Sequence, residues 1–399
     1  MKFKPAFFTF ILLLVGLPFL FSSFMNGQKK AADTLVEIYR QGKINLVQEL
    51  VIDQSNLPTE VVLASPINLS LDSAGNIYLL DFRESDIKKF DLKGKFLQVI
   101  GRPGQGPGEF NAPFSLAIAS DRILVWDMRN RRLTTVSLTG QYLTSANLTQ
   151  LKGRPWRVKA LPDGRFIVET KKTYFADPQK PQEVFLELLS PELEVKKVIY
   201  SHSVWENKFI RFGEGGLANV PLPFSPRVHW DVLPQGKIVI GYSENYEFSL
   251  YTLQGEEIKK ITRPYQPVKV TKEDQKNHFA RMTFASSDGT TKKGAPDFIV
   301  KNTTFPRYKP AYRGLLVDSE GNILIQPYLK DKEKMERTLD VFDSQGNFIQ
   351  RIEVSGIKGS LLTRSGLCWQ GKFIWLIEKD SEGLPIIVKY RVTAWPKKN

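Results

Sequence analysis

The segment RVHWDV, residues 227–232, brings polar side chains close together among aromatic and branched neighbours. His229 and Asp231 are two residues apart, and alternate residues of a β-strand face the same side. A histidine beside a carboxylate can act as an acid–base pair, although such a histidine is more often an ordinary core residue. The sequence therefore offers His229 and Asp231 as candidate catalytic residues and leaves both roles open.

Arginine recurs near the start of strand-like segments in this chain. The segments PWRVKA, PRVHWDV, YRGLLV and TRSGLCW contain, in order, Arg157, Arg227, Arg313 and Arg364. The comparable segments PINLSL and PFSLAI carry Asn68 and Ser115 instead, and Lys159 follows two residues after the first arginine. The planar guanidinium fork matches carboxylate and phosphate groups. If these segments meet in space, the arginines repel one another unless a bound anion or neighbouring acids compensate them, and both outcomes stay open.

Metal chemistry has few candidate ligands in this chain. The three histidines are far apart and Cys368 is the single cysteine, so the sequence contains no histidine pair at ligand spacing and no cysteine cluster. Calcium uses carboxylates and carbonyls, and the candidates for such a site are Asp81, Glu84, Asp127 and Asp231. Asp81 and Asp127 each end a strand-like run before a polar turn, where aspartate usually accepts hydrogen bonds from turn amides. We therefore expect no metal and no cofactor, with calcium as the alternative.

The glycine-rich segment GRPGQGPGEF, residues 101–110, invites comparison with phosphate-binding loops. No Gly-Lys-Ser/Thr follows it, its glycines are not spaced as in a dinucleotide fingerprint, and a strand rather than a helix is expected after it. The chain also contains no Gly-x-Ser-x-Gly motif of serine hydrolases. The segment is therefore predicted to connect strands and not to bind a nucleotide.

The composition is that of a globular protein with a strong positive charge. Hydrophobic residues make up 42% and charged residues 25% of the 399 residues, which permits a sizeable core. The formal net charge of +14 favours an anionic partner, such as an acidic small molecule, a glycan, a protein or a lipid headgroup. Because the basic residues are scattered in pairs and no nucleic-acid-binding motif accompanies them, we expect no nucleic-acid partner.

The first 30 residues predict export from the cytoplasm. Lys2 and Lys4 precede an apolar run, AFFTFILLLVGLPFLFSSF, over residues 6–24. The run is long for a cleaved signal peptide and, with a glycine and a proline inside it, short for a membrane span. Residues 1–30 are therefore expected to be a signal peptide or an N-terminal membrane anchor. The rest of the chain is expected in the periplasm, at the cell surface or outside the cell.

The elements that must position the candidate residues follow a repeated pattern of short strands. Residues 67–101 and 114–146 each read as strand, tight turn, strand ending in aspartate, polar turn, strand, glycine turn and strand. The first and last of these turns are 19 residues apart in both segments, and again between Gly236 and Gly255. A repeated four-strand unit of about 40 residues is typical of a propeller blade. We count six units, which predict an all-β fold, a six-bladed β-propeller with four-stranded antiparallel blades.

Two segments fall outside this simple repeat. The last unit is short of a strand, and residues 44–52 (INLVQELVI) are expected to complete the ring by pairing with it. Residues 271–282 (TKEDQKNHFARM) begin with a Thr-x-x-Asp capping pattern and predict one short helical insertion. The expected organisation is an N-terminal segment with the ring-closing strand over residues 31–65 and the propeller over residues 66–395.

One part of the repeat has a more specific likeness. The pattern GQGPGEF, a strand ending in Asp127, RNRR and then GQYL resembles the NHL repeat and related six-bladed propellers of exported bacterial proteins. The resemblance is strongest over residues 67–146 and weaker towards residue 393, and SDRILVWD replaces the usual Gly-Asn turn. It implies the propeller fold. Because the family includes scaffolds, binding modules and some enzymes, the resemblance does not decide the function.

The longest insertions predict a working face. In a propeller, the connections between blades and the turns between second and third strands lie where the inner strands begin, and every long insertion falls in one of these places. Long ordered loops commonly carry binding residues. With the arginines, Asn68 and Lys159 around the channel mouth, we expect a binding module for an anionic small molecule, glycan or protein rather than an enzyme. The alternative is a hydrolase or lyase with a calcium-type site or with His229 and Asp231.

Overall fold

The computed structural model describes residues 34–174, 177, 180–212, 216–285, 291–362 and 366–395. The predicted export segment, residues 1–30, and the candidate ligand-binding residue Arg364 lie outside the described residues. In the described part, no helix is both long enough and apolar enough to cross a membrane.

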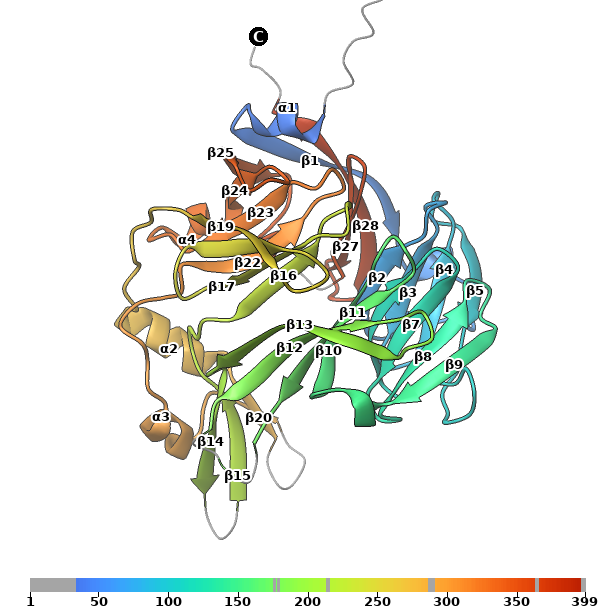
Figure 1. Cartoon of the computed structure of the whole chain (residues 1–399), viewed down its shortest axis with the longest axis horizontal. Helices are drawn as coiled ribbons and strands as arrows, with labels where there is room; N and C mark the ends of the chain where they lie inside the picture. Colours follow the sequence, from blue (N-terminus) through green and yellow to red (C-terminus); the bar gives the residue numbers. More distant parts are fainter. Residues whose placement is uncertain are drawn as a thin grey trace, which may run out of the picture. The chain divides into compact units, whose positions relative to one another are not determined.

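Six antiparallel blades surround a central axis (Figure 1). The first blade consists of β2 (Pro66–Leu71), β3 (Ile77–Asp81), β4 (Asp86–Phe90) and β5 (Phe96–Ile100). The second consists of β6 (Pro113–Ile118), β7 (Arg122–Asp127), β8 (Arg132–Ser137) and β9 (Tyr142–Asn147). The third consists of β10 (Arg154–Ala160), β11 (Phe166–Lys172), β12 (Gln182–Leu189) and β13 (Val195–Val204).

The fourth and fifth blades repeat this order. The fourth consists of β16 (Val228–Val232), β17 (Ile238–Tyr242), β18 (Glu247–Tyr251) and β19 (Glu257–Thr262). The fifth consists of β22 (Tyr312–Val317), β23 (Ile323–Pro327), β24 (Thr338–Phe342) and β25 (Phe348–Ser355). The first strand of each blade lies next to the axis, and the prediction of six four-stranded antiparallel blades is confirmed.

The sixth blade is assembled from both ends of the described chain. Its inner three strands are β26 (Cys368–Gln370), β27 (Phe373–Lys379) and β28 (Pro385–Ala394). Its outer strand is β1 (Lys43–Ile52), which pairs antiparallel with β28, Ile44 opposite Ala394 and Ile52 opposite Ile387. At its start β1 also pairs in parallel with β25 of the fifth blade. The pairing of β1 therefore covers the edge that β28 would otherwise expose.

Burial along the strands follows their place in a blade. The second strands are largely continuous apolar runs; all five residues of β3 and of β23 are buried. Outer strands such as β5 alternate between buried and exposed residues, since one of their faces meets water. The core lies between neighbouring blades, as where Trp126 of the second blade packs in one cluster with Phe166 of the third.

A recurring aspartate turn explains the regular spacing of glycines in the sequence. Asp72 accepts hydrogen bonds from the backbone N–H groups of Ala74 and Asn76, each at 2.9 Å. Gly75 in this turn has a φ of +82°, a conformation that favours glycine. Equivalent turns begin at Asp91, Asp318, Asp343 and Asp380. The aspartate side chain therefore stabilises these tight turns, which join neighbouring strands within a blade.

The insertions join strand ends at the face where the inner strands begin. The connection between the third and fourth blades contains β14 (Asn207–Phe212) and β15 (Gly216–Pro221). The connection between the fourth and fifth contains α2 (Lys272–Ala280), β20 (Thr283–Ala285), β21 (Thr291–Lys293) and α3 (Asp297–Asn302). These two insertions share a small core in which Ile210, Val220 and Ile299 are buried, and Figure 1 shows them side by side.

The predicted helix is present as α2. Thr271 caps it by accepting a hydrogen bond from the N–H of Asp274 at 3.1 Å, and the Asp274 side chain accepts one in return. The described residues also contain three short helices that the sequence did not predict: α1 (Leu35–Tyr39), α3 and α4 (Lys332–Arg337). Each has six residues or fewer, too short to show a helical hydrophobic period.

The glycine-rich connection between the first two blades is held as a rigid turn. Glu109 accepts a hydrogen bond from the N–H of Gly106 at 2.8 Å and pairs with Arg102 at 2.8 Å. The Arg132 guanidinium donates to the carbonyl groups of Gln105, Gly106 and Glu109. The backbone groups of this loop are thus used in hydrogen bonds that hold the loop, as expected for a connecting segment.

Candidate functional site

The first strands of all six blades line a central cavity of about 370 Å³. Its wall includes Asn68 from β2, Leu116 from β6, Arg157 and Lys159 from β10, Asp231 from β16, Leu315 from β22 and Cys368 from β26. Three of the predicted ligand-binding residues, Asn68, Arg157 and Lys159, therefore lie on one surface. The cavity opens between strands because each inner strand presents alternate side chains to the axis.

Lys159 and Asp231 form an ion pair across this cavity. Lys159 Nζ lies 2.9 Å from Asp231 Oδ1, with the aspartate side chain buried and the lysine side chain partly exposed. The Asp231 carboxylate also accepts hydrogen bonds from the N–H groups of Val232 at 2.9 Å and Val317 at 3.1 Å. Burial disfavours the charged carboxylate, but the nearby Lys159 and Arg157 outweigh it and hold the pKa of Asp231 below its usual range. Lys159 is thus already compensated within the protein.

Arg157 is fixed in place by Trp230 of the next blade. Its guanidinium donates a hydrogen bond to the carbonyl oxygen of Trp230, and its Cζ lies 4.2 Å from the centre of the indole ring. The indole in turn donates a hydrogen bond to Glu169 at 2.8 Å. The buried Nε of Arg157 has no hydrogen-bond partner among the described residues. Arg157 is therefore held in place while its Nε–H group has no acceptor among the described residues.

Arg227 and Arg313 stand at the starts of the inner strands of the fourth and fifth blades. Arg227 directly precedes β16 and is exposed, and Arg313 is the second residue of β22 and half-buried. In the part of the chain that the structure describes, neither guanidinium lies within 4.0 Å of a carboxylate. Burial raises the pKa of Tyr328, whereas the positive charges of Arg313 and Arg227 act in the opposite direction.

The pKa of His229 is affected by burial and by the positive charges around it. Burial lowers the pKa of His229 to about 3. The positive charges of Arg157, Arg227 and Lys171 act in the same direction. The imidazole is therefore neutral at ordinary pH and a weak base, and its ring packs 5.3 Å from that of Tyr312. Among the hydrogen bonds of the described residues none joins His229 to Asp231, so the geometry lends no support to an acid–base pair.

The calcium candidates on the first two blades hold turns instead. Asp81 accepts hydrogen bonds from the N–H groups of Ala64, Ser65, Arg83 and Glu84. Asp127 accepts hydrogen bonds from the N–H of Asn111 at 3.0 Å and from the Asn130 side chain at 2.7 Å. Within the described ranges, no group of three or more histidine, cysteine, aspartate or glutamate side chains is placed to hold a metal ion. Asp81 and Asp127 thus bind backbone, as their place before a polar turn indicates.

An exposed aromatic pair beside the arginines was not singled out from the sequence. Trp156 is 51% exposed, and its ring lies 5.2 Å from that of Phe114 on the second blade. Lys171 Nζ lies 5.1 Å from the same indole ring and 2.7 Å from Glu206. The only sequence signal was the indole directly before Arg157 in PWRVKA. An exposed tryptophan next to cationic groups is typical of binding surfaces.

Comparison with known proteins agrees with the fold. The model of the DUF5128 family, described as a 6-bladed beta-propeller, matches residues 58–185. A solved structure from Bacteroides vulgatus ATCC 8482, a member of the DUF4221 family, is similar with a TM-score of 0.52 and 14% identity, covering 89% of this chain and 100% of that chain. This chain is a six-bladed β-propeller; the narrower likeness to the NHL repeat stays a prediction.

Two further solved structures are more distant. A protein from Bacteroides fragilis NCTC 9343, provisionally described as exported, has a TM-score of 0.49 at 11% identity, with 88% of this chain and 95% of that chain covered. Virginiamycin B lyase from Staphylococcus aureus has a TM-score of 0.40 at 12% identity, with 88% and 99% covered. Both TM-scores are too low to carry an argument about function. No curated protein matches the sequence.

Proposed function

We propose that this protein is an exported binding module that takes an anionic ligand at the loop-rich mouth of its propeller channel. The observation that carries the proposal is the unequal compensation of charge. Lys159 and Lys171 are paired with acids, whereas Arg227 and Arg313 have no carboxylate partner among the described residues. A carboxylate or phosphate group would supply the missing counter-charge and accept charge-assisted hydrogen bonds.

The ligand is expected to combine charge with a flat or apolar part. Trp156 offers an exposed ring 5.1 Å from Lys171 Nζ, and Phe114 extends this aromatic surface towards the second blade. An acidic small molecule, an acidic sugar of a glycan or an acidic side chain of a protein shares this chemistry. The long insertions on the same face would add contacts around the rim.

The alternative function, a hydrolase or lyase, has weaker support from the described residues. Asp231 is engaged by Lys159 and two backbone N–H groups, and the low pKa of His229 makes its imidazole a poor proton acceptor. Asp81 and Asp127 likewise accept hydrogen bonds from backbone N–H groups, those of Ser65 and Asn111 in the connections that precede their blades. A reaction would need a free acid or base near the bound ligand.

Export rests on the sequence of residues 1–30, with its basic start and apolar run. A signal peptide places the propeller in the periplasm, at the cell surface or outside the cell, whereas a retained anchor would tether it to a membrane. Comparing the mass of the N-terminal peptide of protein from the source cell with the encoded sequence separates the two forms.

The binding site is tested by removing the two uncompensated charges. The double variant Arg227→Gln/Arg313→Gln should weaken binding of pyrophosphate or citrate, measured by isothermal titration calorimetry, by about tenfold or more, since a hydrogen bond to a charged group contributes about 1.5–3 kcal/mol. The matched control is Lys237→Gln, which removes an exposed charge from the turn between β16 and β17 on the opposite face. Equal affinities in wild type and double variant, or no saturable binding of either anion, would refute the proposal.

A further inference from the structure

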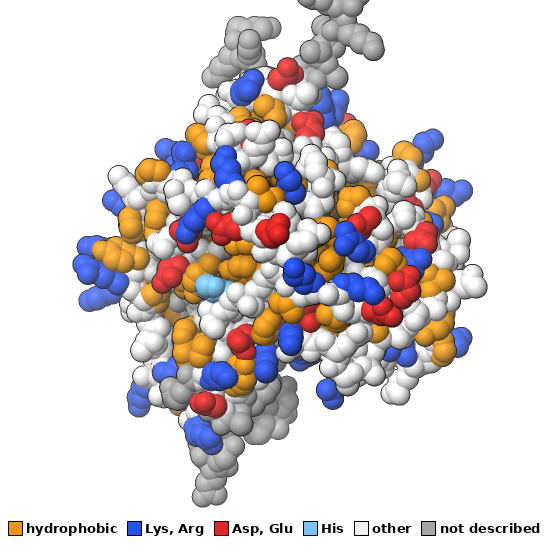
Figure 2. All heavy atoms as spheres, in the orientation of Figure 1, with side chains coloured by type: hydrophobic (Ala, Val, Ile, Leu, Met, Phe, Trp, Pro, Cys, Tyr) orange, Lys and Arg blue, Asp and Glu red, His pale blue; other side chains and the backbone are white. Residues whose placement is uncertain are grey.

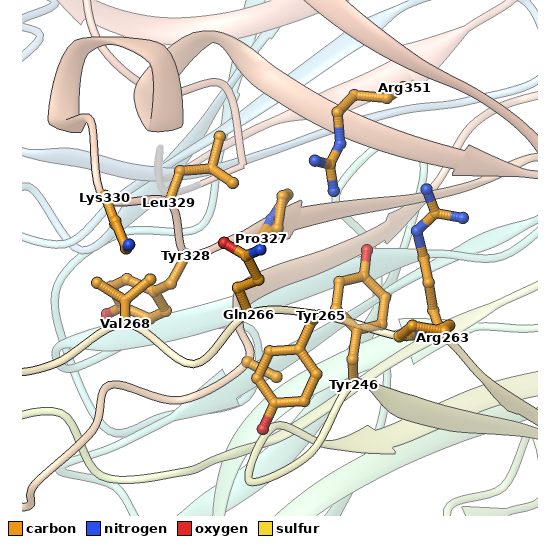
Figure 3. A pocket seen from close by; sticks show the side chains of 12 residues that line it. Tyr246, Arg263, Tyr265, Gln266, Val268, Pro327, Tyr328, Leu329, Lys330 and Arg351 are labelled. Atoms are coloured by element: carbon orange, nitrogen blue, oxygen red, sulfur yellow. The ribbon is translucent and has the colours of Figure 1, made fainter.

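A second cavity, of about 350 Å³, lies between the fourth and fifth blades, away from the axis. Residues after β19 form one wall and residues after β23 form the other (Figure 3). The lining contains three tyrosines and three cations: Tyr246, Tyr265, Tyr328, Arg263, Lys330 and Arg351. Its volume lies at the lower end of the range of small-molecule sites.

A buried aspartate beneath the cavity holds its floor in place. Asp340 is fully buried and receives the two N–H groups of Arg351, at 2.6 and 2.8 Å. Tyr246 donates its hydroxyl to the same carboxylate at 2.6 Å, and Arg263 Nε lies 3.5 Å from it. One carboxylate therefore orients three of the lining side chains before any ligand arrives.

The positive charge of the cavity exceeds what Asp340 can neutralise. Asp340 compensates one of Arg263 and Arg351, Lys330 adds a further exposed charge, and no acidic residue of the described chain lines the cavity. The guanidinium of Arg263 stacks 3.6 Å from the ring of Phe348, and none of its N–H groups donates a hydrogen bond to a described residue. Arg263 is thus held rigidly with its donors available, the arrangement that favours a planar anionic group.

The rest of the lining is suited to a flat ring. The rings of Tyr246 and Tyr265 lie 6.2 Å apart, and Pro264 and Pro327 also line the cavity. Figure 3 shows the two arginines at one end and Tyr328 with Lys330 at the other, with Gln266 between them. A ligand with charge at one end and a ring at the other would meet both kinds of surface.

We propose that this inter-blade pocket binds a small carboxylate that carries a flat ring. The carboxylate occupies the end formed by Arg263 and Arg351, and the ring packs between the tyrosines and prolines. The residues that line this pocket are different from those that line the central cavity, and they include neither Arg227 nor Arg313, so the proposal rests on another set of side chains.

The test uses 3-phenylpropanoate as the probe and its neutral amide, 3-phenylpropanamide, as the matched ligand, both titrated into the full propeller by calorimetry. Wild type should bind the carboxylate, and the amide at least about tenfold more weakly, because the amide loses the charge-assisted hydrogen bonds. Arg263→Gln should weaken binding of the carboxylate by a similar factor and leave the affinity for the amide unchanged. Acetate carries the charge but has no ring, so the wild-type protein should bind it at least about tenfold more weakly than 3-phenylpropanoate.

Controls separate this site from a general charge effect and from the mouth. Lys330→Gln removes an exposed charge from the opposite end of the pocket and should weaken binding of the carboxylate less than Arg263→Gln does, whereas Lys332→Gln, two residues on and outside the pocket, should have no effect. Arg227→Gln/Arg313→Gln removes charges that act on Tyr328 but do not line the pocket, so it should weaken this affinity much less than Arg263→Gln does. Equal binding of acid and amide, no saturable binding up to about 10 mM, or loss of binding in the mouth variant alone would overturn the proposal.

Discussion

Single residues at the channel mouth differ in how their charge is compensated, and this difference carries the functional argument. Lys159 lies against Asp231 and Lys171 against Glu206, so these lysines are part of the fold's own electrostatics. Arg227 has no such partner among the described residues, although it precedes a similar strand. The sequence identified the cationic positions but not their pairing, because the partners come from other strands and blades.

The low pKa of His229 makes stability depend on pH in a defined direction. The unfolded chain takes up a proton near pH 6.5, whereas the folded protein does so near pH 3, so His229 stabilises the fold above pH 6.5 and this contribution is lost as pH falls towards 3. Compared with wild type, His229→Gln should show an unfolding free energy that falls less steeply over this window, by a few kcal/mol in total, since one pKa unit is about 1.4 kcal/mol. Denaturant titrations at several pH values measure this difference. Parallel curves would contradict it.

Asp340 should be among the most sensitive single positions. Asp340→Asn leaves Arg263 and Arg351 without their shared counter-ion and should lower the free energy of unfolding by about 3 kcal/mol. Glu353→Gln is the control, because Glu353 and its partner Lys43 are both partly exposed and ion pairs in contact with water contribute at most about 1 kcal/mol. Urea unfolding of the two variants tests the contrast, and equal losses would show that burial of Asp340 is unimportant.

At the scale of elements, the repeat predicts the blades well and the insertions poorly. The 19-residue turn spacing is readable because each turn is local: Asp72 caps the turn at Gly75, and Ser137 and Thr252 cap those at Gly140 and Gly255. The packing of the β14–β15 hairpin against α3 depends on contacts between two different connections, which no local pattern encodes. The pocket between the fourth and fifth blades was missed for the same reason, since its two walls come from separate loops.

The outer strand of the sixth blade offers a direct test at this scale. Leu46 of β1 is buried, whereas its neighbour Val47 faces the other side and is 36% exposed. Leu46→Asp should destabilise the protein by about 3–5 kcal/mol, because it buries an unpaired charge in the closing sheet. Val47→Asp should lower the free energy of unfolding by less than about 1 kcal/mol. Thermal and denaturant unfolding provide the comparison, and similar losses would mean that β1 contributes little through its buried face.

At the scale of the whole molecule, the propeller brings segments that are distant in the sequence to one face. The inner strands bring residues from all six blades to one cavity, and the long insertions surround its mouth. Figure 2 shows lysine and arginine side chains interspersed with acidic ones, so the positive charge does not form one continuous patch on this face. The anion site proposed at the mouth therefore rests on Arg227 and Arg313, which have no carboxylate partner among the described residues, and not on the overall charge.

The titration of His229, followed by NMR of its imidazole, tests the central claim most directly. Arg227 and its neighbours help to lower the pKa of this side chain, so an anion bound between them should raise that pKa from about 3. We predict an upward shift on saturation with pyrophosphate or citrate, and no further shift on adding either anion to Arg227→Gln/Arg313→Gln. A pKa of His229 that either anion leaves unchanged in the wild-type protein would contradict an anion site at the mouth.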